Sequence, residues 1–243
     1  MVNYIKADLY RILHKQSFFG VIGTYIALFV LLIFILFNPT FTGAMYVSKI
    51  YTFLDFFPLI IGLIIFVSLY VDDVKSNSIQ IAIGYGLPRY KIILSKLLEC
   101  FTLLIITSIC ISLLVLITPI ILEITIDKSQ AINLIKTIFM QMLKTISYIS
   151  MSQILIYHNT NSIEGMIMYL LLSTQVIYIV FNIFLEQKFI VELCGYLNQY
   201  LLTNELYICL NQSFLTLRMI GIILMYILLP VILSMIIFQE REY

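Results

Sequence analysis

Charged residues are scarce in this sequence. Of its 243 residues, 11% are charged and 62% are hydrophobic. A soluble domain usually carries about 25% charged residues, and no soluble core of this size buries so much apolar surface. The shortage of charge therefore excludes a soluble domain and predicts an integral, all-helical membrane protein with the lipid bilayer as its solvent. The net charge of +1 also argues against a nucleic-acid partner.

Catalytic and metal-binding motifs are also lacking. The two histidines and four cysteines form no group with metal-ligand spacing. The sequence contains no G-x-x-x-x-G-K-[ST], H-E-x-x-H or G-x-S-x-G motif, so we expect no enzymatic activity, metal or cofactor on this chain. Cys194 and Cys209 lie in one predicted outer segment, and the sequence leaves open whether they form a disulfide.

Long apolar runs recur along the chain, and about 20 such residues suffice to cross the hydrocarbon of a bilayer. They predict six membrane-spanning helices in a single transmembrane domain covering residues 1–243. The expected spans are residues 18–37, 52–71, 88–122, 131–157, 163–185 and 217–238. Two short outer helices are expected before the last span, near residues 190–201 and 206–214.

The first residues predict an amphipathic helix over 2–15. Its apolar side chains share one face: Val2, Ile5, Leu9, Ile12 and Leu13. Asp8, Arg11 and Lys15 lie roughly opposite. This arrangement predicts a helix in the membrane interface with its basic groups near lipid headgroups.

The orientation follows from the distribution of lysine and arginine. With the N-terminus inside, the inner side holds eight: Lys6, Arg11, Lys15, Lys75, Arg89, Lys91, Lys96 and Arg241. The outer loops hold three, namely Lys49, Lys128 and Lys188. This excess predicts that both termini are cytoplasmic.

The fourth and fifth expected spans carry polar side chains on one side. They are Lys136, Gln141, Lys144 and Tyr148, followed by Gln175, Tyr178 and Asn182. An ammonium at the bilayer centre costs about 2.5–3.5 kcal/mol on insertion scales. These residues are therefore candidates for a substrate route or a subunit interface. The alternative is hydrogen bonding between helices, which we favour for Thr174 and Asn182 and weigh equally for Lys144.

Residues 71–96 form the longest polar interruption in the first half of the chain. Asp72 and Asp73 can cap a short helix, the Gly84–Gly86 turn can end it, and Pro88 can begin the next helix. A solvated loop is the simpler interpretation. Taken alone, the alternation of Ile79, Ile81 and Ile83 favours a strand.

The same segment resembles the first cytoplasmic loop of the type-2 family of ABC transporter permeases, in which a short coupling helix follows the second span. The matching residues are Ser76, Ser78, Gly84, Gly86, Arg89, Lys91 and Lys96, with Asp72 and Asp73 where the family usually has Glu. The N-terminal elbow helix, six spans and short outer helices extend the resemblance over nearly the whole chain. It is a resemblance of pattern rather than of a diagnostic signature.

The resemblance implies a helical, ATPase-coupling segment. Its expected residues are Asp72, Asp73, Lys75, Ser76, Ser78 and Arg89. It further implies two copies of a separate ABC ATP-binding subunit, which would carry the ATP and Mg²⁺. A second permease chain, identical or homologous, would complete the assembly.

Family members of this length include permeases that protect Gram-positive bacteria from lantibiotics. The expected function is therefore the permease subunit of an ATP-driven exporter in a bacterial plasma membrane, expelling an amphiphilic or antimicrobial peptide. One alternative is a non-transporting immunity or sensor protein that binds a toxic peptide. Another is an ABC permease for a drug, a lipid-linked glycan or an ion. The cargo and the choice between a homodimer and a heterodimer remain open.

Overall fold

The computed structural model describes residues 2–37, 41–159, 161–211 and 216–240. Within these ranges every regular element is a helix and there is no strand. The all-helical prediction is therefore confirmed. The alternating isoleucines near residue 80 belong to a helix, α6 (Ser78–Gly84), so the strand that they indicate in isolation is wrong.

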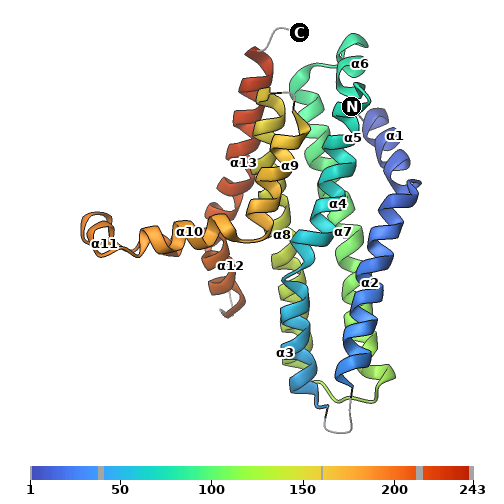
Figure 1. The fold of residues 1–243 in the computed structure, drawn as a ribbon, viewed down its shortest axis with the longest axis vertical. Helices are drawn as coiled ribbons and strands as arrows, with labels where there is room; N and C mark the ends of the chain where they lie inside the picture. Colours follow the sequence, from blue (N-terminus) through green and yellow to red (C-terminus); the bar gives the residue numbers. More distant parts are fainter. Residues whose placement is uncertain (1, 38–40, 160, 212–215, 241–243) are drawn as a thin grey trace.

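The first half of the chain forms long helices that run side by side (Figure 1). They begin with α1 (Val2–Leu13) and α2 (Gln16–Leu36). A single helical run from Gly43 to Lys75 follows. It comprises α3 (Gly43–Leu54), two π-helical turns (Pro58–Gly62 and Val67–Val71), α4 (Leu63–Phe66) and α5 (Asp72–Lys75). This run begins earlier than the expected span of 52–71, because Thr42 caps its first turn by accepting a hydrogen bond from the Met45 N–H at 3.4 Å.

Helices α7 (Arg89–Ile121) and α8 (Lys128–Asn159) follow α6. The bounds of α7 agree with the expected span of 88–122, since Pro88 precedes its first turn. Helix α8 covers the expected span of 131–157 and packs against α7, α9 and α13. Its polar side chains therefore face other helices, which agrees with the interpretation of its polar side.

The expected fifth span is broken in the middle. Helices α9 (Ser162–Ser173) and α10 (Val176–Leu185) meet at an angle of 60°. Gln175 lies at the break with a φ of +62°, a left-handed conformation that ends one helix and redirects the next. Figure 1 shows α10 and α11 (Lys188–Cys194) leaving the bundle sideways.

A short 3₁₀ turn (Leu197–Tyr200) and α12 (Leu202–Asn211) return the chain to α13 (Leu217–Glu240). The expected short helices near 190–201 and 206–214 thus correspond to several shorter elements, and residues 212–214 lie outside the described part. The first turn of α1 and the last turn of α13 lie at the same end of the bundle as α6 (Figure 1). We call this the terminal end, and the other the opposite end.

Four helices are long and apolar enough to cross a membrane, by length and composition. They are Gln16–Leu36, Gly43–Lys75, Arg89–Ile121 and Leu217–Glu240, and the bent pair α9–α10 brings the number to five if it is one span. Several apolar helices could therefore span a membrane, which is consistent with a multi-pass membrane protein. Of the six expected spans, α8 does not meet this test, because its lysines, glutamines and serines lower its hydropathy.

Candidate functional site

A polar pocket of about 220 Å³ lies where α8 meets α3, α12 and the α9–α10 break. It is lined by Asp55, Met140, Gln141, Lys144, Gln175, Thr203, Leu206, Tyr207 and Leu210. Gln141 and Lys144 are close to one helical turn apart on α8, so they present their side chains to the same side. The break at Gln175 brings a third residue from the sequence prediction to this pocket.

The Lys144 ammonium is the central charge of this pocket. The side chain is only 5% exposed. In the part of the chain that the structure describes, no carboxylate lies within ion-pair distance of Lys144, and its nitrogen lies 5.9 Å from the ring centroid of Tyr148. Asp55 lines the same pocket but lies beyond ion-pair distance, and a buried cation without a direct ion pair is costly, so this pocket is suited to an additional partner.

Among the described residues, one carboxylate lines the polar pocket, and it already accepts a hydrogen bond. Asp55 is exposed, and its Oδ1 accepts a hydrogen bond from Gln141 Nε2 at 2.8 Å. The other side-chain atom of Gln141, Oε1, is buried with no hydrogen-bond partner among the described residues. Lys144 and Gln141 therefore both retain hydrogen-bonding capacity at this pocket.

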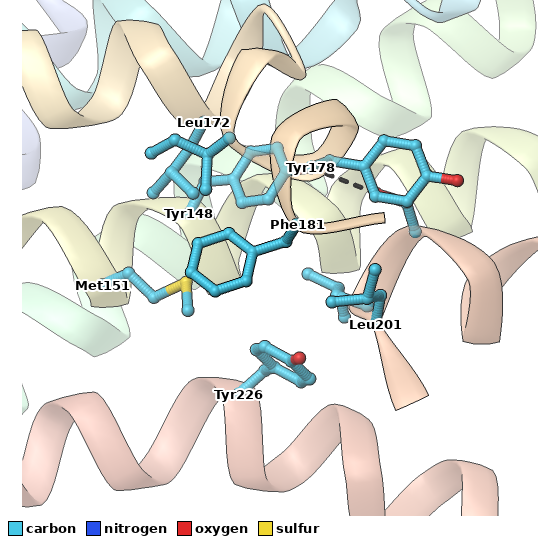
Figure 2. A pocket seen from close by; sticks show the side chains of 10 residues that line it. Tyr148, Met151, Leu172, Tyr178, Phe181, Leu201 and Tyr226 are labelled. Atoms are coloured by element: carbon cyan, nitrogen blue, oxygen red, sulfur yellow. Dashed lines mark hydrogen bonds between the residues drawn. The ribbon is translucent and has the colours of Figure 1, made fainter. Parts of the chain in front are cut away.

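An apolar cleft of about 230 Å³ adjoins the polar pocket. It is lined by Tyr148, Met151, Leu172, Ile177, Tyr178, Phe181, Leu201, Leu202, Thr203 and Tyr226. Figure 2 shows Phe181 pointing between Met151 and Leu201, with Tyr226 opposite. The hydroxyl groups of Tyr148 and Thr203 lie 3.4 Å apart, and Thr203 lines both cavities.

Two of the predicted residues lie outside both cavities. Lys136 is partly exposed further towards the start of α8. Asn182 instead accepts a hydrogen bond from Asn204 Nδ2 at 3.2 Å, and Tyr178 donates to Asn204 Oδ1 at 2.6 Å. These bonds hold α10 against α12. Asn182 therefore takes part in hydrogen bonding between helices, the interpretation that we favoured for it.

Sequence reasoning did not include Asp55, Thr203, Tyr207 or Tyr226 in this site. Asp55 had a signal, because it is the only acidic residue between positions 9 and 71. The other three have none, since a Thr or Tyr in an apolar helix is common at protein–lipid boundaries.

A second group of charges joins three helices at the terminal end. Lys96 of α7 forms ion pairs with Asp8 of α1 and Asp73 of α5, and with Glu99 at 3.1 Å. Arg11 pairs with Asp8 at 2.5 Å and with Asp73 at 2.6 Å. We call Asp8, Arg11, Asp73, Lys96 and Glu99 the ion cluster.

The ion cluster corrects the expectation for the polar side of α1. Asp8 is 9% exposed and its partner Lys96 is fully buried, while Lys15 pairs with Asp72. These side chains turn towards α5 and α7 rather than towards lipid headgroups. Buried carboxylates and ammonium groups require partners, and those partners come from helices distant in sequence.

The pKa values of α1 reflect this contact. Burial is the largest influence on Asp8 and favours its neutral form, but the charge of Lys96, the hydrogen bonds with Glu99 and Lys96 and the charge of Arg11 together outweigh burial and lower the pKa of the Asp8 carboxyl. Burial likewise opposes the charge of Arg11, yet Asp73 and Asp8 raise the pKa of its guanidinium. Burial raises the pKa of the nearby Tyr4 to about 12. The pair Asp8 and Arg11 is therefore charged at neutral pH.

The remaining predicted residues of the segment near residue 80 have different environments. Lys75 and Ser76 are exposed and Ser78 is partly exposed. Arg89 Nη1 donates to the carbonyl oxygens of Phe238 at 2.9 Å and Gln239 at 3.3 Å. These contacts satisfy carbonyls at the end of α13 and place a cation at its negative end.

An exposed surface surrounds α6, which we call the α6 tip. Ile81 is 55% and Tyr85 is 86% exposed, and Lys75, Ser76 and Gln80 are exposed with them. Asn77 has a φ of +54° and Gly86 a φ of +82°, so a left-handed residue bounds the short helix near each end. The α6 tip is thus a defined helical projection rather than an extended loop.

Cysteine and metal chemistry are limited in this chain. Cys209 is a buried free thiol, and the side chain of Cys194, the partner that the sequence left open, lies outside the described part. Among the described residues, no group of three His, Cys, Asp or Glu side chains is arranged to hold a metal ion.

Comparison with known proteins yields no relative. No family model, no curated protein and no solved structure matches this chain.

Proposed function

We propose that this chain is the membrane-spanning permease subunit of an ATP-driven ABC exporter in a bacterial plasma membrane. In this proposal it crosses the membrane six times, with α8 as the fourth span and the terminal end in the cytoplasm. A separate ATP-binding subunit, in two copies, docks at the α6 tip. A second permease chain completes the transporter, and an amphiphilic peptide is the cargo.

The α6 tip is the observation that supports the proposal most strongly. Its apolar side chains Ile81 and Tyr85 stand exposed among polar ones, as expected of a surface that a soluble partner covers. The tip also leads directly into α5 and α7, so a force applied there reaches two long helices without a flexible linker.

The ion cluster and Arg89 would transmit such a force. Asp73, at the start of the tip, pairs with Lys96 of α7 and Arg11 of α1. Arg89, at its end, holds the last turn of α13. Closure of two ATPase subunits beneath the membrane would therefore move α1, α7 and α13 together, as a rigid-body transition.

Co-purification with ABC ATP-binding subunits encoded beside this chain tests the proposal. Tyr85→Ala combined with Ile81→Ser should reduce recovery of the ATPase about ten-fold or more, because the exposed apolar contact is lost. Tyr10→Ala is the matched control, since Tyr10 is a 65% exposed tyrosine on α1. Absence of a bound ATPase, or equal binding by both variants, would overturn the proposal.

A second candidate function is a membrane protein that captures a toxic peptide without transporting it. The exposed apolar side chains of α10 and α11 favour it, among them Phe184, Phe189 and Leu193. Peptide protection that persists when no ATPase gene is expressed would select this function over export. Protection that requires an intact ATPase would select export.

A further inference from the structure

The polar pocket and the apolar cleft adjoin each other, and we call the two together the hollow. Thr203 lines both, and its contact with the Tyr148 hydroxyl marks their boundary. Lys144 lies on the polar side of this boundary and Met151 on the apolar side. A molecule with a charged head and an apolar chain can therefore lie across the boundary, with each part in a matching environment.

Lys144 determines the sign of the head group. Its side chain is 95% buried, since 5% is exposed, and among the described residues its ammonium has no ion pair or hydrogen bond. The pocket carboxylate of Asp55 is solvated and bound by Gln141 instead. A buried ammonium gains most from an anion that accepts its hydrogen bonds, so an anionic head fits better than a neutral one.

We propose that this hollow binds an anionic amphiphile. A carboxylate or phosphate head accepts hydrogen bonds from Lys144 in the polar pocket. The apolar chain lies in the cleft among Met151, Phe181 and Tyr226. The ligand is either a free amphiphile or a membrane lipid, which share this chemistry. The inference adds a ligand class to the chain and does not rest on ATP-driven transport, because binding needs no ATPase.

Photolabelling of the full chain in phosphatidylcholine nanodiscs tests the inference. The probe is decanoate with a diazirine near the end of its chain, and its methyl ester is the neutral comparison. The acid should label residues of the apolar cleft, such as Met151 and Phe181, about ten-fold more than the ester, because a charged hydrogen bond is lost in the ester. Equal labelling by acid and ester would overturn the inference.

Variants of Lys144 and Lys136, both on α8, assign the effect to Lys144. Lys144→Gln should reduce acid labelling about ten-fold, whereas Lys144→Arg retains the charge and should restore most of it. Lys136→Gln is the matched control, because it removes the same charge from the same helix outside both cavities. Restoration by arginine separates lost binding from misfolding. Undiminished labelling of Lys144→Gln would contradict the inference.

Asp55 provides an independent test of charge. Asp55→Asn removes a negative charge from the pocket and should strengthen acid labelling, since like charges no longer repel. A loss of labelling in this variant would mean that the Asp55 carboxylate supports binding of the acid instead of repelling it, and the inference would fail.

The source of the anion is found by competition. If phosphatidylglycerol in the nanodisc suppresses labelling of Met151 by the acid, the natural ligand is a membrane lipid. If only added decanoate suppresses it, the ligand is a free amphiphile. Either result supports an anionic head, and suppression by neutral lipid or decanol alone would argue against it.

Discussion

At the scale of single residues, Lys96 has the most demanding position in this chain. It is fully buried and pairs with three carboxylates from three helices. Removal of its ammonium leaves Asp8, Asp73 and Glu99 close together, with only Arg11 to offset their charge. Removing one partner of a buried ion pair typically lowers the free energy of unfolding by about 3–5 kcal/mol.

Lys96→Met should therefore destabilise the chain strongly, with a lower midpoint of thermal unfolding in detergent. Lys91→Met is a suitable control, because Lys91 lies on the same helix and is not part of the ion cluster. An unchanged midpoint for Lys96→Met would mean that the ion cluster contributes little to stability.

Gly62 illustrates a second constraint at this scale. A Cβ atom there would overlap the Tyr169 hydroxyl and the methyl group of Thr145. The Tyr169 hydroxyl donates a hydrogen bond to the carbonyl oxygen of Pro58, in the first π-helical turn, at 2.5 Å. The Tyr169 ring can therefore move away from a Cβ atom at position 62 only by weakening this hydrogen bond.

We expect Gly62→Ala to reduce stability by about 1–3 kcal/mol through overpacking. Gly20→Ala should be neutral or slightly stabilising, since nothing lies within 4 Å of a Cβ there. Thermal unfolding of the two variants in one detergent measures the difference. Equal midpoints would contradict the close approach at Gly62.

At the scale of elements, the break between α9 and α10 depends on one left-handed residue. Gln175 adopts a φ of +62°, which a β-branched side chain tolerates poorly. Gln175→Val should lower stability by about 1–2 kcal/mol, whereas Gln175→Gly should raise it slightly. Thr174→Val at the neighbouring right-handed position is the control. Cysteine cross-linking between α10 and α12 would report whether the bend persists.

Helix α1 should be released from the bundle at low pH. The folded pKa of Asp8 is lowered, so its contact with Lys96 is present above the ordinary carboxyl pKa of about 4. The stabilisation is lost as the pH falls through the folded pKa. Hydrogen exchange of α1 amides, corrected for the intrinsic rate, should rise in that range. Asp8→Asn should remove this pH dependence, and its persistence in that variant would assign the effect to another group.

At the scale of the whole molecule, the orientation in the membrane is directly testable. Ser76 and Lys128 are both exposed and lie at the terminal and opposite ends. Single cysteines placed there in a cysteine-free chain should react differently with an impermeant maleimide. In intact cells the Lys128 position should be labelled and the Ser76 position protected. Labelling of both positions from one side would overturn the expected topology.

Much of the helical arrangement could be predicted from the sequence. A long apolar run forms a helix in a membrane because a helix satisfies its own backbone hydrogen bonds. The polar side of α8 could also be predicted, since the spacing of Gln141 and Lys144 places them on one face of a helix. The bend at Gln175 was not, because the polar run at residues 173–175 contains no glycine or proline, and polar side chains within a span are equally typical of hydrogen bonds between helices. The ion cluster was not either. Its bonded pair Asp8 and Lys96 is 88 positions apart, and the polar residues of α1 fit a membrane interface equally well.

The sideways course of α10 and α11 has a consequence for the surrounding lipid. At that depth the molecule's outline is elongated, with the projecting helices apolar around much of their circumference. Where these helices lie within a bilayer, the acyl chains of one leaflet part over a longer boundary than at the terminal end. After extraction in detergent, the detergent belt would extend further on the side of α10 and α11 than on the other sides. Short-chain detergents would cover these two helices least well and leave them exposed to water.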